Sequence, residues 1–321
     1  MSIISWFRGK FGKNSLKKQV EQNIKPHSLK LGLALGGGGT RGAAYIGMFK
    51  AFEEAGLHFD YVAGTSAGAL FGSAYCAGLS SNDMLNIATN LKAKDIRTNK
   101  ISFMPSKTDK FSAFIDEILR HKTFEDMSIP FTAVVVDLIT GDELHMNTGD
   151  IGKCVAGSCA FPGAFVPVEY PPYRLIDGSL RNNIPADVVR DMGADIVLAV
   201  DLNPARGLGT SSTKYLDLMK TSLGIVMKAN SLGGYVYSDY VLKFDLSEFS
   251  QTKLDNVQGM VDLAYNITKE EMPNILKVLG MHIPNEDIKE TIKRVKLMQK
   301  RAKRIAKENM KKEKENKTLA E

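Results

Sequence analysis

The chain has 321 residues, of which 44% are hydrophobic and 24% are charged, and its formal net charge is +6. This length and apolar content are enough for one large buried core with extensions, so we expect a single domain. No apolar run reaches the roughly 18 residues of a membrane-spanning helix, and basic residues interrupt the N-terminal apolar residues before a signal-peptide core could form. The three cysteines have neither a disulfide framework nor a zinc-site spacing, which favours a cytoplasmic protein in a reducing compartment.

The first predicted element is a basic amphipathic extension over residues 1–30. It carries seven Lys and Arg and one acidic residue. Beside Trp6, its apolar residues recur at helical spacing: Ile3, Ile4, Phe7 and Phe11. Such a segment can lie on an anionic membrane. A helix packed against the body and a solvated terminus fit the pattern as well, so membrane contact is one of three open interpretations.

A glycine-rich loop follows the first predicted strand, Leu31–Leu35. Its sequence is Gly36-Gly37-Gly38-Gly39-Thr40-Arg41-Gly42, and a helix is expected directly after it over Ala43–Ala55. Successive glycines expose backbone N–H groups. Acyl transfer develops negative charge on a carbonyl oxygen, and such donors stabilise that charge near a helix N-terminus. The loop is therefore a candidate oxyanion site.

The same loop has a second interpretation, because Gly37, Gly39 and Gly42 satisfy the G-x-G-x-x-G pattern of a dinucleotide-binding loop. That pattern also requires an acidic residue at the end of the second strand, where it would bind the ribose. Asp60 has nearly the right distance but stands at the start of that strand. Nucleotide binding is therefore the weaker interpretation.

The most informative stretch is Gly64-Thr65-Ser66-Ala67-Gly68, which lies between a predicted strand at Phe59–Ala63 and a predicted helix at Ala69–Tyr75. A nucleophilic serine is commonly exposed at a sharp strand-to-helix turn, between two glycines. The turn strains the serine backbone, and only small residues two positions away let strand and helix approach each other. The flanking glycines meet that need, so Ser66 is the candidate nucleophile.

Apolar strands and helical runs alternate along the rest of the chain, as in an α/β sheet. The clearest further strands are Phe131–Val136 and Ile196–Val200, and further helices are predicted at Asp109–Arg120, Ala186–Met192 and Tyr215–Lys228. The segment Leu202–Thr213 follows a strand and is predicted to be a loop at the rim of the site.

A serine nucleophile needs a base, and the histidines offer no obvious one. The chain has five, at His27, His58, His121, His145 and His282, and none stands in a clearly catalytic setting. Of these, only His282 lies late in the chain. A Ser-Asp-His site that uses His282 is the competing arrangement within hydrolases.

Asp177 is the more informative candidate base. Tyr173–Ile176 is predicted to be a strand that delivers Asp177, and Gly178-Ser179 turns the chain directly afterwards. An aspartate at a strand end can reach a site that neighbouring strand ends form. The alternative is that Asp177-Gly178 is a hairpin turn between two strands.

The last predicted element is a basic helix and tail over residues 286–321. It carries thirteen Lys and Arg and seven acidic residues, so the body from residue 31 to 285 has a net charge of −6. Its apolar stripe comprises Ile288, Ile292, Val295, Met298, Ala302 and Ile305. The stripe favours packing, with membrane or anionic-partner binding as the alternative, and the stretch from Lys311 to Glu321 is expected to be disordered. Nucleic acid is not an expected partner, because the basic ends lack a recognisable reading motif.

Taken together, the glycine loop with Arg41, the Gly64–Gly68 motif and Asp177-Gly178-Ser179 resemble the three signatures of the patatin-like phospholipases. The segment from Gly157 to Phe165 is similar to the small-residue and proline segment before the family's aspartate. The resemblance covers roughly Leu31 to Leu202. Ser179 departs from the family pattern, which more often has glycine or alanine at that position.

The resemblance implies a three-layer α/β/α sandwich with a mainly parallel central sheet, over residues 31–285. It also implies a Ser66-Asp177 dyad without histidine, in which Asp177 activates Ser66. The oxyanion donors would be Gly37, Gly38 and Gly39, and the supporting residues would be Arg41, Gly64, Gly68 and Gly178.

We therefore expect a serine acyl-ester hydrolase that releases a fatty acid from a phospholipid, a lysophospholipid or another lipid ester. No cofactor and no metal are expected, because the P-loop pattern is absent and no metal-ligand cluster stands out. The lipid ester is the expected partner, and the protein is expected in the cytoplasm, with contact to the inner face of the membrane left open. Outside enzymes, the alternative is a lipid-binding or regulatory protein that keeps a hydrolase fold without turnover.

Overall fold

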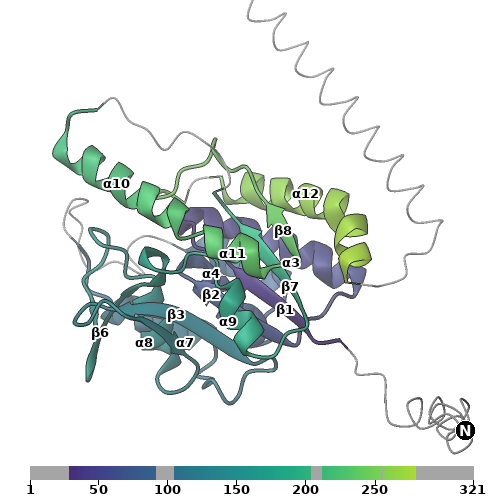
Figure 1. The fold of residues 1–321 in the computed structure, drawn as a ribbon, viewed down its shortest axis with the longest axis horizontal. Coiled ribbons are helices and arrows are strands. Elements are labelled where there is room, and N and C mark those ends of the chain that lie inside the picture. The colour runs from purple at the N-terminus through teal and green to yellow at the C-terminus, as the bar shows by residue number, and fades with distance from the viewer. Residues whose placement is uncertain (1–28, 92–104, 204–211, 255, 280–321) are drawn as a thin grey trace, which may run out of the picture.

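The structure is a computed structural model, and it describes residues 29–91, 105–203, 212–254 and 256–279 (Figure 1). Nearly all of the predicted basic extension, the whole C-terminal helix and tail, and most of the predicted loop after residue 202 fall outside these ranges. No helix within them is long and apolar enough to cross a membrane.

One eight-stranded sheet forms the centre of the fold, and its hydrogen-bonded path runs β5-β6-β3-β2-β1-β7-β8, with β4 also paired to β3 (Figure 1). The parallel strands are β1 (Leu31–Leu35), β2 (Tyr61–Thr65), β3 (Phe131–Asp137), β7 (Ile196–Asp201) and β8 (Tyr240–Lys243). The antiparallel strands are β4 (Glu143–Met146), β5 (Val168–Tyr170) and β6 (Tyr173–Asp177). Every residue of β1 and β3 is buried, as expected for apolar strands that helices cover on both faces.

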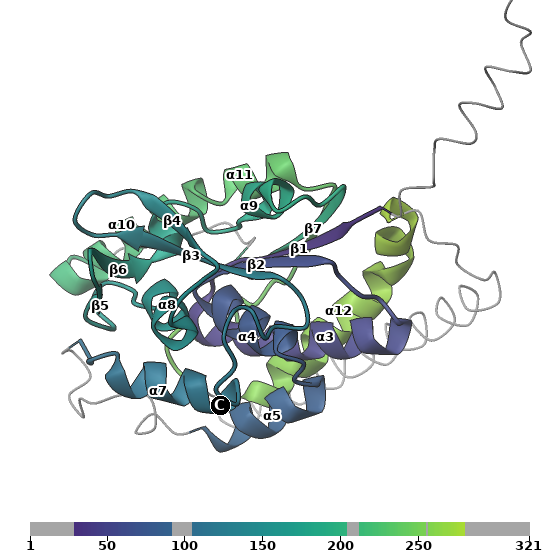
Figure 2. The same ribbon diagram turned by 90° about the horizontal axis from the view of Figure 1, so that it is seen from below.

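Helices cover both faces of the sheet and complete the three predicted layers (Figure 2). One face carries α3 (Ala44–Ala55), α4 (Ala67–Cys76), α5 (Ser81–Asn90), α7 (Asp109–Ile118), α8 (Ile151–Ser158) and α12 (Val257–Val278). The other face carries α9 (Ala186–Asp191) and α11 (Leu232–Tyr237), preceded by α10 (Tyr215–Ala229). The α/β fold and its mostly parallel sheet are thus as predicted.

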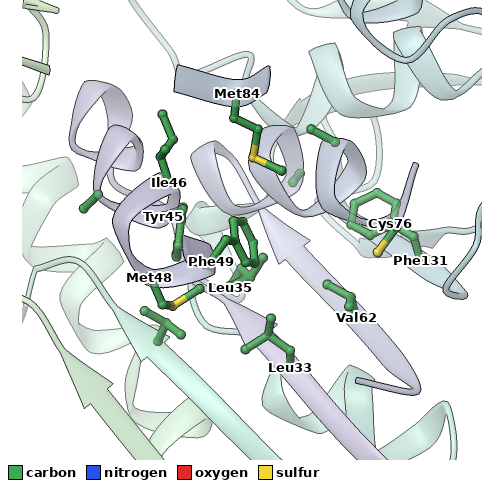
Figure 3. Close-up of a cluster of buried hydrophobic side chains, with 14 of the residues drawn as sticks. Leu33, Leu35, Tyr45, Ile46, Met48, Phe49, Val62, Cys76, Met84 and Phe131 are labelled. Carbon is green, nitrogen blue, oxygen red and sulfur yellow. The ribbon is translucent and has the colours of Figure 1, made fainter. Parts of the chain in front are cut away.

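The larger core lies between the sheet and α3. Figure 3 shows Leu33 and Leu35 of β1 and Val62 of β2 lying close to Tyr45 and Phe49 of α3, and all five side chains are fully buried. Removing such apolar side chains from water is the main source of stability for the fold. The sequence predicted these strands and α3 because their apolar residues are contiguous or recur at helical spacing.

Two short 3-10 helices stand at positions where the sequence analysis gave a simpler description. Residues Gly39–Ala43 form η1, so the first α-helix begins at Ala44 after a tight turn. Residues Gly178–Leu180 form η2 directly after β6. The hairpin interpretation of Asp177-Gly178 is therefore wrong, because no strand after β6 in the described residues pairs with it.

α12 is a long helix that the sequence analysis did not predict, and it packs closely on α3. A β carbon added at Gly47 of α3 would lie 2.0 Å from the carbonyl oxygen of Val261 in α12. The two helix backbones therefore touch at a position that has room only for hydrogen.

We predict that Gly47→Ala lowers the free energy of unfolding by roughly 1–3 kcal/mol, because the added methyl group must push α3 and α12 apart. Gly233→Ala is the matched control, since nothing lies within 4 Å of a β carbon at that helical glycine. The control should be neutral or stabilise by up to about 1 kcal/mol. Urea denaturation measures both, and equal stabilities for the two variants would contradict the close crossing.

Candidate active site

The register of the sheet brings the candidate nucleophile and the candidate base together. β2 pairs with residues 131–134 of β3, β6 pairs with residues 135–137, and β4 pairs with residues 133–136. A strand has only two hydrogen-bonding edges, so β4 occupies one edge, and β2 and β6 lie end to end on the other. Thr65 is opposite Val134 and Asp177 is opposite Val135. Ser66, the residue after Thr65, is therefore next to the end of β6.

The same junction explains the turn after Asp177. Gly178 cannot continue along β3, because Thr65 of β2 already occupies the position opposite Val134. The chain passes so close to β3 that a β carbon at Gly178 would lie 2.3 Å from the carbonyl oxygen of Val134. The chain then leaves the sheet as η2.

The backbone of Ser66 is strained, with φ 54° and ψ −121°, a region that a residue with a side chain rarely adopts. A β carbon at Gly64 would lie 2.3 Å from the carbonyl oxygen of Gly68, and one at Gly68 would lie 2.0 Å from that of Leu35. These contacts give the physical reason for glycine on both sides of the serine. Ser66 stands at the tip of the turn, at the N-terminus of α4, and is 8% exposed.

Ser158 and Cys159, to which the sequence analysis gave no role, hold this turn. The Ser66 N–H donates to Ser158 Oγ at 2.8 Å, and the Ser158 hydroxyl donates to the carbonyl oxygen of Val134 at 2.6 Å. The Cys159 thiol donates to the carbonyl oxygen of Ser66 at 3.2 Å. Burial raises the pKa of this thiol well above its usual range, and the nearby Asp177 carboxylate adds to the shift. Cys159 is therefore a neutral donor.

Asp177 is buried with one carboxylate oxygen uncommitted. Its Oδ1 accepts the N–H of Ser179 at 2.9 Å, and its Oδ2 is buried without a hydrogen bond to any residue in the described ranges. Burial raises the pKa of Asp177 to about 6, although hydrogen bonding by Ser179 and the nearness of the Ser66 hydroxyl favour the charged form. A carboxylate with this pKa is a stronger base than an exposed aspartate and is still charged at pH 7.

The glycine loop lies against Ser66, but its amides differ in what they bind. The Gly37 N–H donates to the carbonyl oxygen of Asn183 at 3.1 Å, so this expected oxyanion donor is already engaged. The amides of Gly38 and Gly39 donate to no group in the described part of the chain. A β carbon at Gly37 would lie 3.2 Å from Cβ of Ser66, which places the loop next to the candidate nucleophile.

Arg41 fastens the glycine loop from outside. Its guanidinium donates to the carbonyl oxygen of Phe249 at 3.0 Å and to Asn203 Oδ1 at 2.7 Å. Asn203 in turn donates to the carbonyl oxygen of Gly37 at 3.1 Å. On the other side of the loop, the carbonyl oxygen of Gln251 accepts the N–H of Thr40 at 3.1 Å. Arg41 is therefore placed to position the loop.

The histidines that the structure describes are not part of this arrangement. His58 and His121 are exposed, and His145 lies in β4 with its Nε2 2.8 Å from Glu143 Oε1. His27 and His282 lie outside the described residues. Within those residues, no three His, Cys, Asp or Glu side chains are grouped as a metal site.

The dinucleotide interpretation does not fit the fold. Asp60 directly precedes β2. Its carboxylate accepts hydrogen bonds from the Lys30 ammonium at 2.7 Å and from the Leu31 N–H at 2.9 Å. Leu31 begins β1, whereas the glycine loop follows the other end of that strand. Asp60 is thus at the edge of the sheet away from the loop and cannot reach a ribose bound there.

Comparison with known proteins identifies a family match in the first two thirds of the chain. Residues 33–190 match the family model described as patatin-like phospholipase. Mouse patatin-like phospholipase domain-containing protein 7 is 32% identical over 187 residues, which cover 54% of this chain and 13% of the relative. Neuropathy target esterase sws of Drosophila melanogaster is 34% identical over 183 residues, with the same coverage. An uncharacterized NTE family protein of Mycobacterium tuberculosis is 32% identical over 187 residues, 56% of this chain and 32% of that protein.

Among solved structures, VipD from Legionella pneumophila has the same fold, with a TM-score of 0.53 and 15% sequence identity over 79% of this chain and 67% of that chain. The fold and the family match define the class of this domain, a patatin-like phospholipase domain. The chain contains a domain of the patatin-like phospholipase family, over residues 33–190. Its match spans about a third or less of the curated relatives' own length.

We predict that Ser158→Ala loosens the turn at Ser66. The change leaves the Ser66 N–H and the Val134 carbonyl oxygen without their common partner, which should cost about 1–3 kcal/mol of unfolding free energy. The rate at which a fluorophosphonate probe labels Ser66 should fall by about tenfold or more, because the candidate nucleophile is no longer held in place. Ser73→Ala is the control, since this buried hydroxyl donates only to Leu70 of its own helix at 2.9 Å. Equal labelling rates in both variants would exclude a positioning role for Ser158.

The pKa of Asp177 predicts how stability depends on pH. Because the folded-state pKa is raised from 3.8 to about 6, the stability present below pH 4 is lost as the pH rises through 6. A shift of this size corresponds to about 3 kcal/mol. Asp177→Asn removes the titrating group. Between pH 4 and pH 8, the unfolding free energy of Asp177→Asn should therefore rise by about 3 kcal/mol relative to that of the wild type. Parallel stability curves over this range would show that Asp177 is not charged in a buried site.

Proposed function

We propose that the chain is a serine acyl-ester hydrolase whose nucleophile is Ser66 and whose base is Asp177. The observation that carries the proposal is the junction on β3, where a strained serine stands next to a buried carboxylate with an uncommitted oxygen. The family match favours a phospholipid, a lysophospholipid or another lipid ester as substrate.

In the first step, Oγ of Ser66 attacks the ester carbonyl carbon while its proton passes to Asp177 Oδ2. The carbonyl electron pair moves to the oxygen and forms an oxyanion. Collapse of this intermediate breaks the bond to the alkoxide, which takes the proton from Asp177 and leaves as an alcohol. The product is an acyl-enzyme on Ser66.

In the second step, water gives a proton to Asp177 and attacks the acyl-enzyme. The fatty acid leaves, and Oγ of Ser66 takes the proton back. The same carboxylate therefore acts as base and then as acid in each half of the reaction. Its raised pKa suits both tasks, because a group whose pKa is near the working pH both accepts and returns a proton readily.

The oxyanion would be stabilised by the uncommitted amides of Gly38 and Gly39, together with the amide of Ala67 at the N-terminus of α4. Gly37 has a different role in this proposal. Its amide is bound to Asn183, and its lack of a side chain lets the loop approach Ser66. Gly37 thus shapes the site, whereas its two neighbours donate.

The supporting residues act through the positions of these groups. Arg41 holds the glycine loop through Asn203 and Phe249. Gly64 and Gly68 permit the sharp turn at Ser66, and Gly178 lets the chain leave β3 after Asp177. None of the four needs to contact the substrate.

The test is reaction with a fluorophosphonate probe followed by mass spectrometry, on the wild type, Ser66→Ala and Asp177→Asn. We expect one adduct on Ser66, no adduct in Ser66→Ala, and a large loss of labelling rate in folded Asp177→Asn. The wild-type rate should rise with pH through about 6 and then level off, because only charged Asp177 accepts the proton. Asp177→Asn should lack this rise.

Two outcomes would favour the alternatives. Loss of turnover in folded His282→Ala, with labelling of Ser66 retained in Asp177→Asn, would favour a Ser-Asp-His enzyme. A folded wild type that gives no adduct and cleaves no lipid ester would favour a lipid-binding or regulatory protein. If Ser66 is labelled as expected, a lipid-ester screen on the unlabelled wild type would identify the headgroup and acyl chain of the substrate.

A further inference from the structure

Two consecutive helices, α10 and α11, expose a concentration of apolar side chains. Of the fourteen large hydrophobic residues that are most exposed in the described ranges, eight lie between residues 215 and 237. They are Tyr215, Leu218, Met219, Ile225, Val226, Leu232, Val236 and Tyr237, and we call them the 215–237 apolar face. Single exposed hydrophobic residues are normal on a protein surface, whereas a contiguous group indicates a surface that binds something.

The pattern on α10 is that of an amphipathic helix whose apolar stripe points to solvent. Tyr215, Leu218 and Met219 recur at helical spacing, and Ile225 and Val226 continue the same side two turns later. Their exposed fractions range from 44% to 73%. A stripe of this kind normally packs on the core, so here it is available to a partner.

The charge of these helices indicates the kind of partner. Residues 214–237 include three lysines and one aspartate. Lys228 pairs with the buried Asp201 at 3.3 Å, and the other three charges sum to +1, although the body of the chain is acidic overall. The chain's own terminal segments, 1–30 and 286–321, are strongly basic, so they have the same sign as this region and are disfavoured as its cover. A second copy would likewise oppose lysines to lysines. A surface that is both apolar and anionic fits best, and an anionic lipid bilayer has both properties.

The 215–237 apolar face is also fastened to the candidate site. At the C-terminal end of α10, Asn230 Nδ2 donates to the carbonyl oxygen of Leu180 in η2 at 2.6 Å. At the start of α11, Ser231 Oγ accepts Asn183 Nδ2 at 2.9 Å. Leu180 lies three residues after Asp177, and Asn183 binds the glycine loop. A surface that docks on these helices is therefore held in register with the groups around Ser66.

We propose that the 215–237 apolar face docks on an anionic lipid bilayer and so presents membrane lipids to the site. This inference rests on the proposed function, because it takes the substrate to be a lipid ester in a membrane. Tyr215 and Tyr237, at the two ends of the face, suit the headgroup level, where aromatic rings with one polar end are enriched. The net positive charge of the region suits the anionic headgroups, and the aliphatic side chains enter the acyl region.

The test uses the full chain and sedimentation with vesicles, either phosphatidylcholine alone or with roughly 30% phosphatidylglycerol. The variant combines Tyr215→Ser, Ile225→Ser and Val236→Ser, which change exposed side chains only. The control combines Leu29→Ser and Val278→Ser, two exposed apolar residues, of which Leu29 precedes β1 and Val278 is the last residue of α12. The start of β1 and the end of α12 lie at the other end of the molecule from α10 (Figure 1). Circular dichroism and the urea midpoint establish that each variant is folded.

We expect binding to anionic vesicles to fall by at least about tenfold in the triple variant and to remain near the wild-type value in the control. The ratio of vesicle-lipid hydrolysis to hydrolysis of a short monomeric ester should fall with it. Undiminished vesicle binding by the triple variant would overturn the proposal. A wild-type dimer, detected by ultracentrifugation and lost in the triple variant, would also overturn it in favour of a second copy.

The binding experiment is repeated in the Ser66→Ala background, so that it does not depend on catalysis. If Ser66→Ala binds anionic vesicles through the face and the wild type cleaves no ester, docking stands and the hydrolase proposal fails. If the wild type cleaves monomeric esters but the face makes no difference to vesicle binding, the hydrolase proposal stands and docking fails.

Discussion

The site depends on one constraint, which is that two strands share a single edge of β3. β2 ends opposite Val134, and β6 ends at Asp177 opposite Val135, so the two chains meet head-on and neither can continue. Each must leave the sheet at once: one turns into α4 through the strained Ser66, and the other turns into η2 through Gly178. The close contacts at the glycines are consequences of this junction. The meeting of the candidate nucleophile and base therefore follows from backbone pairing, before any side-chain contact between them is considered.

Burial raises the pKa of Asp177 at the junction, and it also costs folding free energy. A carboxylate with one oxygen unsatisfied in a buried position opposes folding, and its raised pKa measures that opposition. The strained φ and ψ of Ser66 act in the same direction. The surrounding structure compensates with fully buried strands and with the Ser158 hydroxyl, which satisfies both the Ser66 N–H and the Val134 carbonyl oxygen. Stability from the core thus maintains a local arrangement that would not persist alone.

Short sequence patterns predicted the parts of the fold that depend on residues close together in the chain. The buried runs at β1, β3 and β7 and the motif around Ser66 are contiguous in sequence, so strand, turn and helix could be expected there. The roles of Ser158 and Asn183 could not, because each binds a group about 90 or more residues away. The engaged amide of Gly37 is hidden for the same reason, since four consecutive glycines look alike until Asn183 selects one. α12 carries an apolar helical pattern, but its importance depends on the contact with Gly47.

The segment that holds the glycine loop has a consequence for how this protein could be divided. The family match ends at residue 190, yet the loop is held by Asn203, Phe249 and Gln251, and β7 pairs with β1 along its whole length. α12 covers α3 from still later in the chain. The region that sequence comparison outlines is therefore smaller than the unit that must fold together. A fragment cut at the alignment boundary, or a graft of only the three motifs onto another scaffold, would keep the signature residues and lose the framework that arranges them.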